Sequence, residues 1–116
     1  KDMTSGCTKE ACSFRDLKQE FDDAGAVIFG VSRDTVNSHE KFINKENLNF
    51  TLLSDPEATI CEKYGVWQEK SMYGKTSMGI VRTTFVIDGE GVIRKIWPKV
   101  EVDKHADAVL EFVKSL

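Results

Sequence analysis

A short, nearly continuous apolar run over residues 26–31 constrains the fold of this chain more than any other segment. Such runs are typical of parallel strands covered on both faces, whereas strands with one solvated face alternate apolar and polar residues. The run follows an amphipathic helical pattern over residues 8–24, which Gly25 ends. The pattern therefore predicts an α/β fold in which residues 26–31 form a central parallel strand.

Helical and strand patterns continue to alternate along the rest of the chain. Asp55-Pro56-Glu57 supplies a capping side chain, a proline suited to the first helical turn and a charge that suits the helix dipole. The mixed, glycine-containing stretch 66–81 has the length of a functional loop. The elements predicted beyond residue 31 are a helix over 37–46 capped by Asn37, a strand over 50–53, a helix from Asp55 to Gly65, a long connection over 66–81, a hairpin over 82–97 and a helix over 103–116.

The length and composition limit the classes of function. A chain of 116 residues is enough for one domain with its own core, so we expect a single domain over residues 1–116. The net charge of −3, with both signs interspersed, provides no basic stripe for nucleic acid and no polybasic patch for a membrane. Three irregularly spaced cysteines do not resemble a secreted disulfide framework, so we expect a reducing, cytoplasmic environment.

The segment from Thr4 to Cys12 carries the clearest chemical signal. Cys7 follows a turn of small residues at the start of a helix, where unpaired N–H groups and the helix dipole stabilise a thiolate. On a continuous helix, Cys12 is displaced from Cys7 by about 7.5 Å of rise and roughly 140° of rotation. A disulfide requires Cα atoms within about 7 Å, so the two cysteines can pair only if the first turns unwind. The spacing leaves open a transient redox pair or two ordinary buried cysteines.

Short motifs recur along the whole chain in a specific order and spacing. They are Thr4-Ser5-Gly6-Cys7-Thr8 with Cys12, Gly30-Val31-Ser32, Ser38-His39, Leu52-Leu53-Ser54-Asp55, Tyr64-Gly65-Val66-Trp67, Tyr73-Gly74-Lys75 and Arg82-Thr83-Thr84-Phe85-Val86-Ile87-Asp88. Together they resemble the bacterioferritin comigratory protein, or peroxiredoxin Q, branch of the peroxiredoxins over essentially the whole chain. The resemblance implies a thioredoxin-like fold, a three-layer α/β/α sandwich with a mixed central sheet. It also implies a thiol peroxidase that reduces hydrogen peroxide and organic hydroperoxides with electrons from thioredoxin.

The same resemblance implies roles for four residues. Cys7 matches the peroxidatic cysteine, which the peroxide oxidises to a sulfenic acid, and Cys12 matches the resolving cysteine that some members carry in this helix. Thr4 matches the threonine that holds the peroxide, and Arg82 matches the distant arginine that approaches the thiolate. The branch looks mainly monomeric, and we expect no cofactor and no metal.

The chain departs from the family pattern in two places. Ser5 stands where the family usually has proline, which should loosen the turn that presents the thiolate. The family motif begins with a proline and a preceding strand, whose place lies before Lys1. We therefore expect that the N-terminal strands are missing from this sequence and that a strand edge is left open.

Some residues and functions admit plainer interpretations. Cys61 could resolve the sulfenic acid, but its apolar helical face favours a buried structural cysteine. His39 is predicted to lie on the surface at a helix start and His105 in the last helix, and neither has the spacing of a zinc ligand. A disulfide oxidoreductase would have its cysteines separated by only two residues, and the remaining alternatives are a non-catalytic binding module and an inactive fragment.

Overall fold

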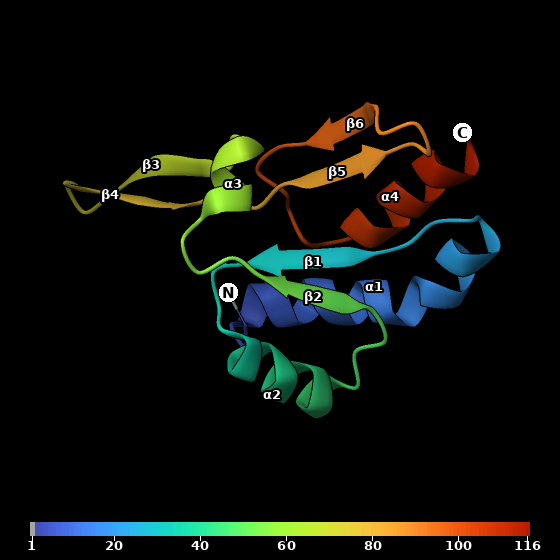
Figure 1. Ribbon diagram of the computed structural model, residues 1–116, viewed down its shortest axis with the longest axis horizontal. Coiled ribbons are helices and arrows are strands. Elements are labelled where there is room, and N and C mark those ends of the chain that lie inside the picture. The colour runs from blue at the N-terminus through green and yellow to red at the C-terminus, as the bar shows by residue number, and fades with distance from the viewer. Residues whose placement is uncertain (1) are drawn as a thin grey trace.

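The computed structural model describes residues 2–116, in which helices and strands alternate as the sequence predicts up to residue 63, after which several strands follow one another before the last helix (Figure 1). The helices are α1 (Ser5–Asp23), α2 (Val36–Glu46), α3 (Thr59–Lys63) and α4 (His105–Lys114). The strands are β1 (Phe29–Ser32), β2 (Thr51–Ser54), β3 (Trp67–Met72), β4 (Lys75–Ile80), β5 (Thr84–Ile87) and β6 (Ile93–Trp97).

The strands of residues 2–116 pair into three two-stranded sheets. β1 and β2 are parallel, whereas β3 pairs with β4 and β5 with β6 in antiparallel register. Parallel and antiparallel pairs thus both occur, as a mixed sheet requires, but the pairs are not hydrogen-bonded to one another. The parallel strand predicted over residues 26–31 is observed as β1, Phe29–Ser32. Within residues 2–116 its one strand neighbour is β2, and Phe29 and Val31 remain 59% and 40% exposed, so the predicted central position, covered on both faces, is not observed in the described chain.

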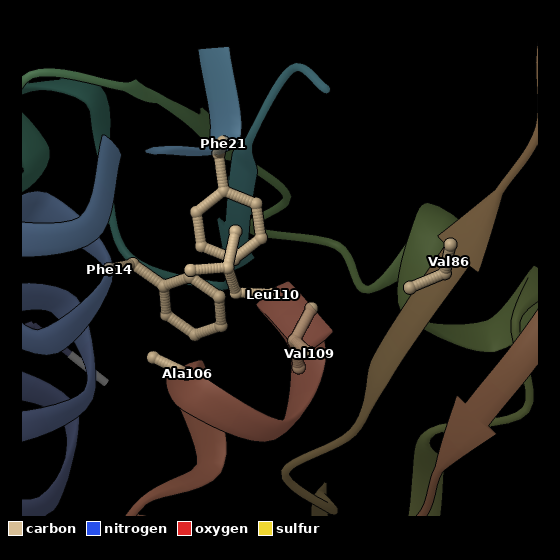
Figure 2. Packing of buried hydrophobic residues seen from close by; sticks show 6 residues of the cluster. All are labelled: Phe14, Phe21, Val86, Ala106, Val109 and Leu110. Carbon is tan, nitrogen blue, oxygen red and sulfur yellow. The ribbon is translucent and has the colours of Figure 1, made fainter. Parts of the chain in front are cut away.

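Two clusters of buried apolar side chains hold the elements together. Figure 2 shows the larger one, in which Phe14 and Phe21 of α1 face side chains of α4. Its members are Phe14, Phe21, Val86, Ala106, Val109 and Leu110. The smaller cluster joins α1 to α2 and to the chain that follows α2, through Ala11, Phe42 and Leu48. Helix α1 contributes to both clusters, so the element that carries Cys7 and Cys12 is central to the fold.

The starts of two helices differ from the prediction. Thr35, and not Asn37, caps α2, because its Oγ1 accepts the N–H of Ser38 at 3.1 Å. Helix α3 begins only at Thr59, although the sequence predicted a start at Asp55. The carboxylate of Asp55 still serves as an acceptor for this helix, since Oδ2 accepts the backbone N–H of Cys61 at 2.9 Å across an intervening turn.

The prediction of a long loop over residues 66–81 is wrong, because the segment forms the β3–β4 hairpin, which extends away from the body of the molecule (Figure 1). Tyr73 and Gly74 have φ angles of 53° and 74°, which is the left-handed backbone of a two-residue hairpin turn. Most residues of the two strands are polar, and their few apolar residues, such as Trp67, Met78 and Ile80, do not give the sustained alternation by which strands are recognised. The guanidinium of Arg33 lies 4.5 Å from the ring centre of Trp67 and joins the base of this hairpin to the end of β1.

Candidate active site

Cys7 lies in the first turn of α1, as the sequence predicts. The N-cap residue Thr4 is extended (φ −82°, ψ 155°), and its carbonyl accepts the N–H of Thr8 at 2.8 Å, which closes the first helical turn. The N–H groups of such a first turn have no acceptor within the helix, and together with the helix dipole they favour an anion. The side chain of Thr4 makes no capping bond to the helix, and Thr4 and Cys7 share the same helix end.

Arg82 reaches this helix end from the segment between β4 and β5. Its Nη2 donates a hydrogen bond to Cys7 Sγ at 2.9 Å, although the two residues are 75 positions apart in sequence. The carbonyl of Arg82 accepts the N–H of Val100 at 2.9 Å, which fixes its backbone beside the chain that follows β6. A Cβ atom at Gly6 would lie only 3.0 Å from Nη1 of Arg82, so the missing side chain leaves room for the guanidinium.

Glu10 holds the other side of the same guanidinium. Its Oε2 lies 3.3 Å from Nε of Arg82, with side-chain exposures of 19% for Glu10 and 30% for Arg82. Burial raises the pKa of Glu10, and the charge of Arg82 partly opposes that shift. Because a guanidinium is planar and its donors are fixed in a fork, one contact through Nε orients the Nη2 that faces the sulfur. The sequence alone left the role of Glu10 open, since nothing in it indicates that Arg82 lies opposite.

Cys12 lies further along α1 and faces α2. Its thiol donates to Oε2 of Glu46 at 3.5 Å. Burial and this hydrogen bond raise the pKa of the Cys12 thiol, while the charge of Arg15 partly opposes the rise. No disulfide joins Cys7, Cys12 or Cys61, and helical geometry separates the Cα atoms of Cys7 and Cys12 by roughly 9 Å. The structure thus brings Cys7, Thr4 and Arg82 together but keeps Cys12 apart from Cys7.

Cys61 has the environment of a structural cysteine. Its side chain is 3% exposed on α3, and burial, together with the hydrogen bond and charge of Asp55, raises the pKa of this thiol to about 11. Within residues 2–116, no group of three or more His, Cys, Asp or Glu side chains could hold a metal ion. No helix in the same described range is long and apolar enough to cross a membrane.

Comparison with solved structures identifies the class of fold. Peroxiredoxin Q from Xanthomonas campestris superposes with a TM-score of 0.96 at 49% identity, over 99% of this chain and 73% of that chain. Peroxidoxin BcpB from Mycobacterium tuberculosis superposes with a TM-score of 0.87 at 38% identity, over 100% of this chain and 74% of that chain. The fold is therefore the thioredoxin-like fold of the peroxiredoxins, as the motifs predicted.

Sequence comparison identifies the family. Residues 1–96 match the AhpC/TSA family. Peroxiredoxin Bcp from Xanthomonas campestris is 49% identical over 115 residues, which cover 99% of this chain and 72% of that protein. Peroxiredoxin Bcp from Bacillus subtilis is 48% identical over 116 residues, which cover 100% of this chain and 74% of that protein. The chain belongs to the AhpC/TSA family, in its Bcp or peroxiredoxin Q branch, and is a peroxidase of the oxidoreductase class.

Proposed function

We propose that this peroxiredoxin reduces hydrogen peroxide and organic hydroperoxides through Cys7, with Cys12 as the resolving cysteine and thioredoxin as the reductant. The observation that carries the proposal is the 2.9 Å contact between Arg82 Nη2 and Cys7 Sγ at the N-terminus of α1. The bacterioferritin comigratory protein of Xanthomonas campestris, at 48% identity, is described as having alkyl peroxide reduction activity. This likeness supports organic hydroperoxides as substrates beside hydrogen peroxide.

In the first step, the Cys7 thiolate attacks the terminal oxygen of the hydroperoxide. The O–O bond breaks, the remaining oxygen leaves as an alcohol or water after taking up a proton, and Cys7 becomes a sulfenic acid. Negative charge moves from the sulfur to the leaving oxygen, and the Arg82 guanidinium, already beside the sulfur, stabilises that charge. The hydroxyl of Thr4, at the same helix end, holds the peroxide in line with the sulfur.

In the second step, Cys12 resolves the sulfenic acid. The Cys12 sulfur attacks the Cys7 sulfur, the S–O bond breaks, and the hydroxyl group leaves as water with the proton that Cys12 gives up. A reduced thioredoxin then returns both cysteines to thiols by disulfide exchange and is itself oxidised. Because Cys12 faces Glu46 in the wound helix, the first turns of α1 must open before the disulfide can form.

An intramolecular disulfide requires no second subunit, so we propose that the protein acts as a monomer. Residues 1–116 would belong to a single peroxiredoxin domain whose N-terminal strands lie outside this sequence, and the protein would act in the cytoplasm, where thioredoxin keeps thiols reduced.

Oxidation with one equivalent of peroxide tests the proposal. The reduced protein is treated with hydrogen peroxide or cumene hydroperoxide, peroxide consumption is followed, and disulfides are mapped by non-reducing peptide mass spectrometry. We expect rapid consumption and a Cys7–Cys12 disulfide, a trapped sulfenic acid in Cys12→Ser, and no change in Cys61→Ser. Slow consumption with intact thiols would refute the peroxidase role, and a disulfide that includes Cys61 would refute the role of Cys12.

A further inference from the structure

The segment that precedes α1 is anchored by partly buried hydrogen bonds outside the site described above. The backbone N–H of Asp2 donates to Asp34 Oδ2 at 2.9 Å. The side-chain Oδ2 of Asp2 accepts from Ser38 Oγ at 2.9 Å and lies 2.7 Å from Nδ1 of His39. The side chains of Asp2 and His39 are each only 5% exposed. The prediction that His39 lies on the surface is therefore wrong. Its ring can be buried because the carboxylate of Asp2 forms a hydrogen bond with it.

The ring of His39 is held from both sides. Its Nε2 lies 3.1 Å from the carbonyl oxygen of Leu53, which can only accept, so Nε2 carries a hydrogen. Its Nδ1 lies 2.7 Å from Oδ2 of Asp2, which is a partly buried hydrogen bond, charge-assisted through the carboxylate. The ring thus ties the N-terminal segment to α2, which carries His39, and to β2, which carries Leu53.

The second acceptor of the anchor, Asp34, is itself fixed. Its Oδ2 accepts from Ser32 Oγ at 2.6 Å, and its carbonyl accepts from Ser54 Oγ at 2.5 Å. Burial alone would raise the pKa of Asp34, but the hydrogen bonds from the Ser32 hydroxyl and the Asp2 N–H hold this pKa below its usual range. A carboxylate anchored to the ends of β1 and β2 therefore fixes the backbone of Asp2.

A strained turn at Met3 connects the anchored residue Asp2 to the start of α1, which carries Cys7. Met3 has a φ of 60°, a left-handed conformation that is unfavourable for a residue with a side chain. Such a conformation persists only where its neighbours are fixed, here Asp2 on one side and the N-cap Thr4 on the other. The helix begins directly afterwards, at Ser5, and Cys7 lies in its first turn.

We propose that His39 is a positioning residue for Cys7, which acts through Asp2 and holds the start of α1 in the wound form that reacts with peroxide. The inference rests on the proposed roles of Cys7 and Cys12. The anchor restrains the chain just before the turns that must open to form the Cys7–Cys12 disulfide, so it opposes that opening. It therefore speeds oxidation of Cys7 and slows the disulfide step. A residue that only stabilised the fold would not change the two steps in opposite directions.

Two variants separate these steps. In His39→Gln, the amide of the new side chain can donate to only one of the two partners, Asp2 or the Leu53 carbonyl, at a time, so the charge-assisted hydrogen bond to Asp2 is lost. Ser38→Ala removes only the hydroxyl bonded to Asp2, and the N–H of residue 38 remains available to the Thr35 cap, so α2 should still form. His105→Gln is the matched control, because His105 is a 6% exposed histidine of α4 whose Nε2 lies 2.7 Å from Thr84 Oγ1, outside the anchor.

Three quantities are measured in the wild type and the variants. They are the second-order rate of Cys7 oxidation by hydrogen peroxide, the first-order rate of disulfide formation, and the fraction of Cys7 that excess peroxide converts to sulfinic acid. For His39→Gln we expect oxidation to slow by about tenfold, the effect of losing one charge-assisted hydrogen bond. We expect disulfide formation to accelerate several-fold and the sulfinic fraction to fall. Ser38→Ala should change these three quantities in the same directions but by a smaller factor. His105→Gln should not change the rates of Cys7 oxidation and of disulfide formation in opposite directions.

The outcomes distinguish this inference from the proposed function. If the wild type forms a sulfenic acid and then the disulfide, while both rates in Ser38→Ala and His39→Gln fall together or stay at wild-type values, the positioning role is refuted and the peroxidase mechanism stands. If His39→Gln fails to fold, as judged by its melting temperature, Ser38→Ala decides alone. If the wild type itself forms neither product, the proposed function fails and the positioning role fails with it.

Discussion

Replacing Arg82 with methionine removes the guanidinium that contacts the Cys7 sulfur. Nη2 of Arg82 donates to Cys7 Sγ at 2.9 Å, and its side chain is 30% exposed. A hydrogen bond to a charged group contributes about 1.5–3 kcal/mol. At about 1.36 kcal/mol for each factor of ten, the second-order rate with hydrogen peroxide should fall by about 10- to 150-fold.

Arg82→Lys separates charge from geometry. An ammonium keeps the positive charge but lacks the planar fork with which the guanidinium contacts Cys7 and Glu10 together. The rate of the lysine variant should therefore lie between those of the methionine variant and the wild type.

Stopped-flow mixing of the reduced protein with peroxide, followed by the consumption of peroxide, measures the rate. Arg94→Met is the matched control, since Arg94 is half exposed and contacts only the carboxylate of Asp88, at 3.3 Å, among the ion pairs of the described chain. Its rate should equal that of the wild type. If Arg82→Met remains folded and reacts within about threefold of the wild type, the guanidinium does not stabilise the reacting sulfur and the reasoning is refuted.

Three further changes test the site and the core. Gly6→Ala should place a methyl group 3.0 Å from Arg82 Nη1, so peroxide reactivity should fall several-fold. The melting temperature should stay level or rise, since alanine favours a helix by about 0.5–1 kcal/mol. An unchanged rate would contradict the close approach of Arg82 to Gly6. The neutral Cys61 thiol, with its pKa raised to about 11 from 9.0, should add stability that is present below pH 9 and lost as the pH rises from 9 to 11, and denaturant titrations of the wild type and Cys61→Ala should converge over that range. Phe21→Ala should cost about 3–5 kcal/mol of unfolding free energy in the same titrations, because the ring is 2% exposed in the core, and a loss below about 1 kcal/mol would contradict its packing.

Local sequence patterns predicted those parts of the fold that depend on neighbouring residues. The periodicity of residues 8–24 predicted α1, and Gly91, with φ 81°, lies in the predicted turn between β5 and β6. The β3–β4 hairpin was missed, because most of its strand residues are polar and its few apolar residues give no sustained alternation. The cap of α2 was misplaced by two residues, since Thr35 and Asn37 are both good capping residues and only the geometry selects between them.

The residues of the site differ in whether the sequence alone identified them. Helix-start chemistry indicated Cys7, whereas Arg82 was found only through the family resemblance, because its contact spans 75 positions. Glu10 and His39 could not be assigned from sequence, since each depends on a partner from another element that no local pattern reveals. Burial of His39 in particular requires an aspartate 37 positions away.

Arg82 and Cys7 are carried by different elements of the fold. Arg82 is joined to the chain beside β6, whereas Cys7 lies in the first turn of α1. The apolar contact between α1 and α4, which includes Phe14 and Leu110, holds α1 in place (Figure 2). The distance between the Cys7 sulfur and the Arg82 guanidinium therefore depends on how well this core contact is packed. A small cavity at that contact should let α1 shift and should reduce peroxide reactivity before any loss of helix or strand becomes visible by circular dichroism.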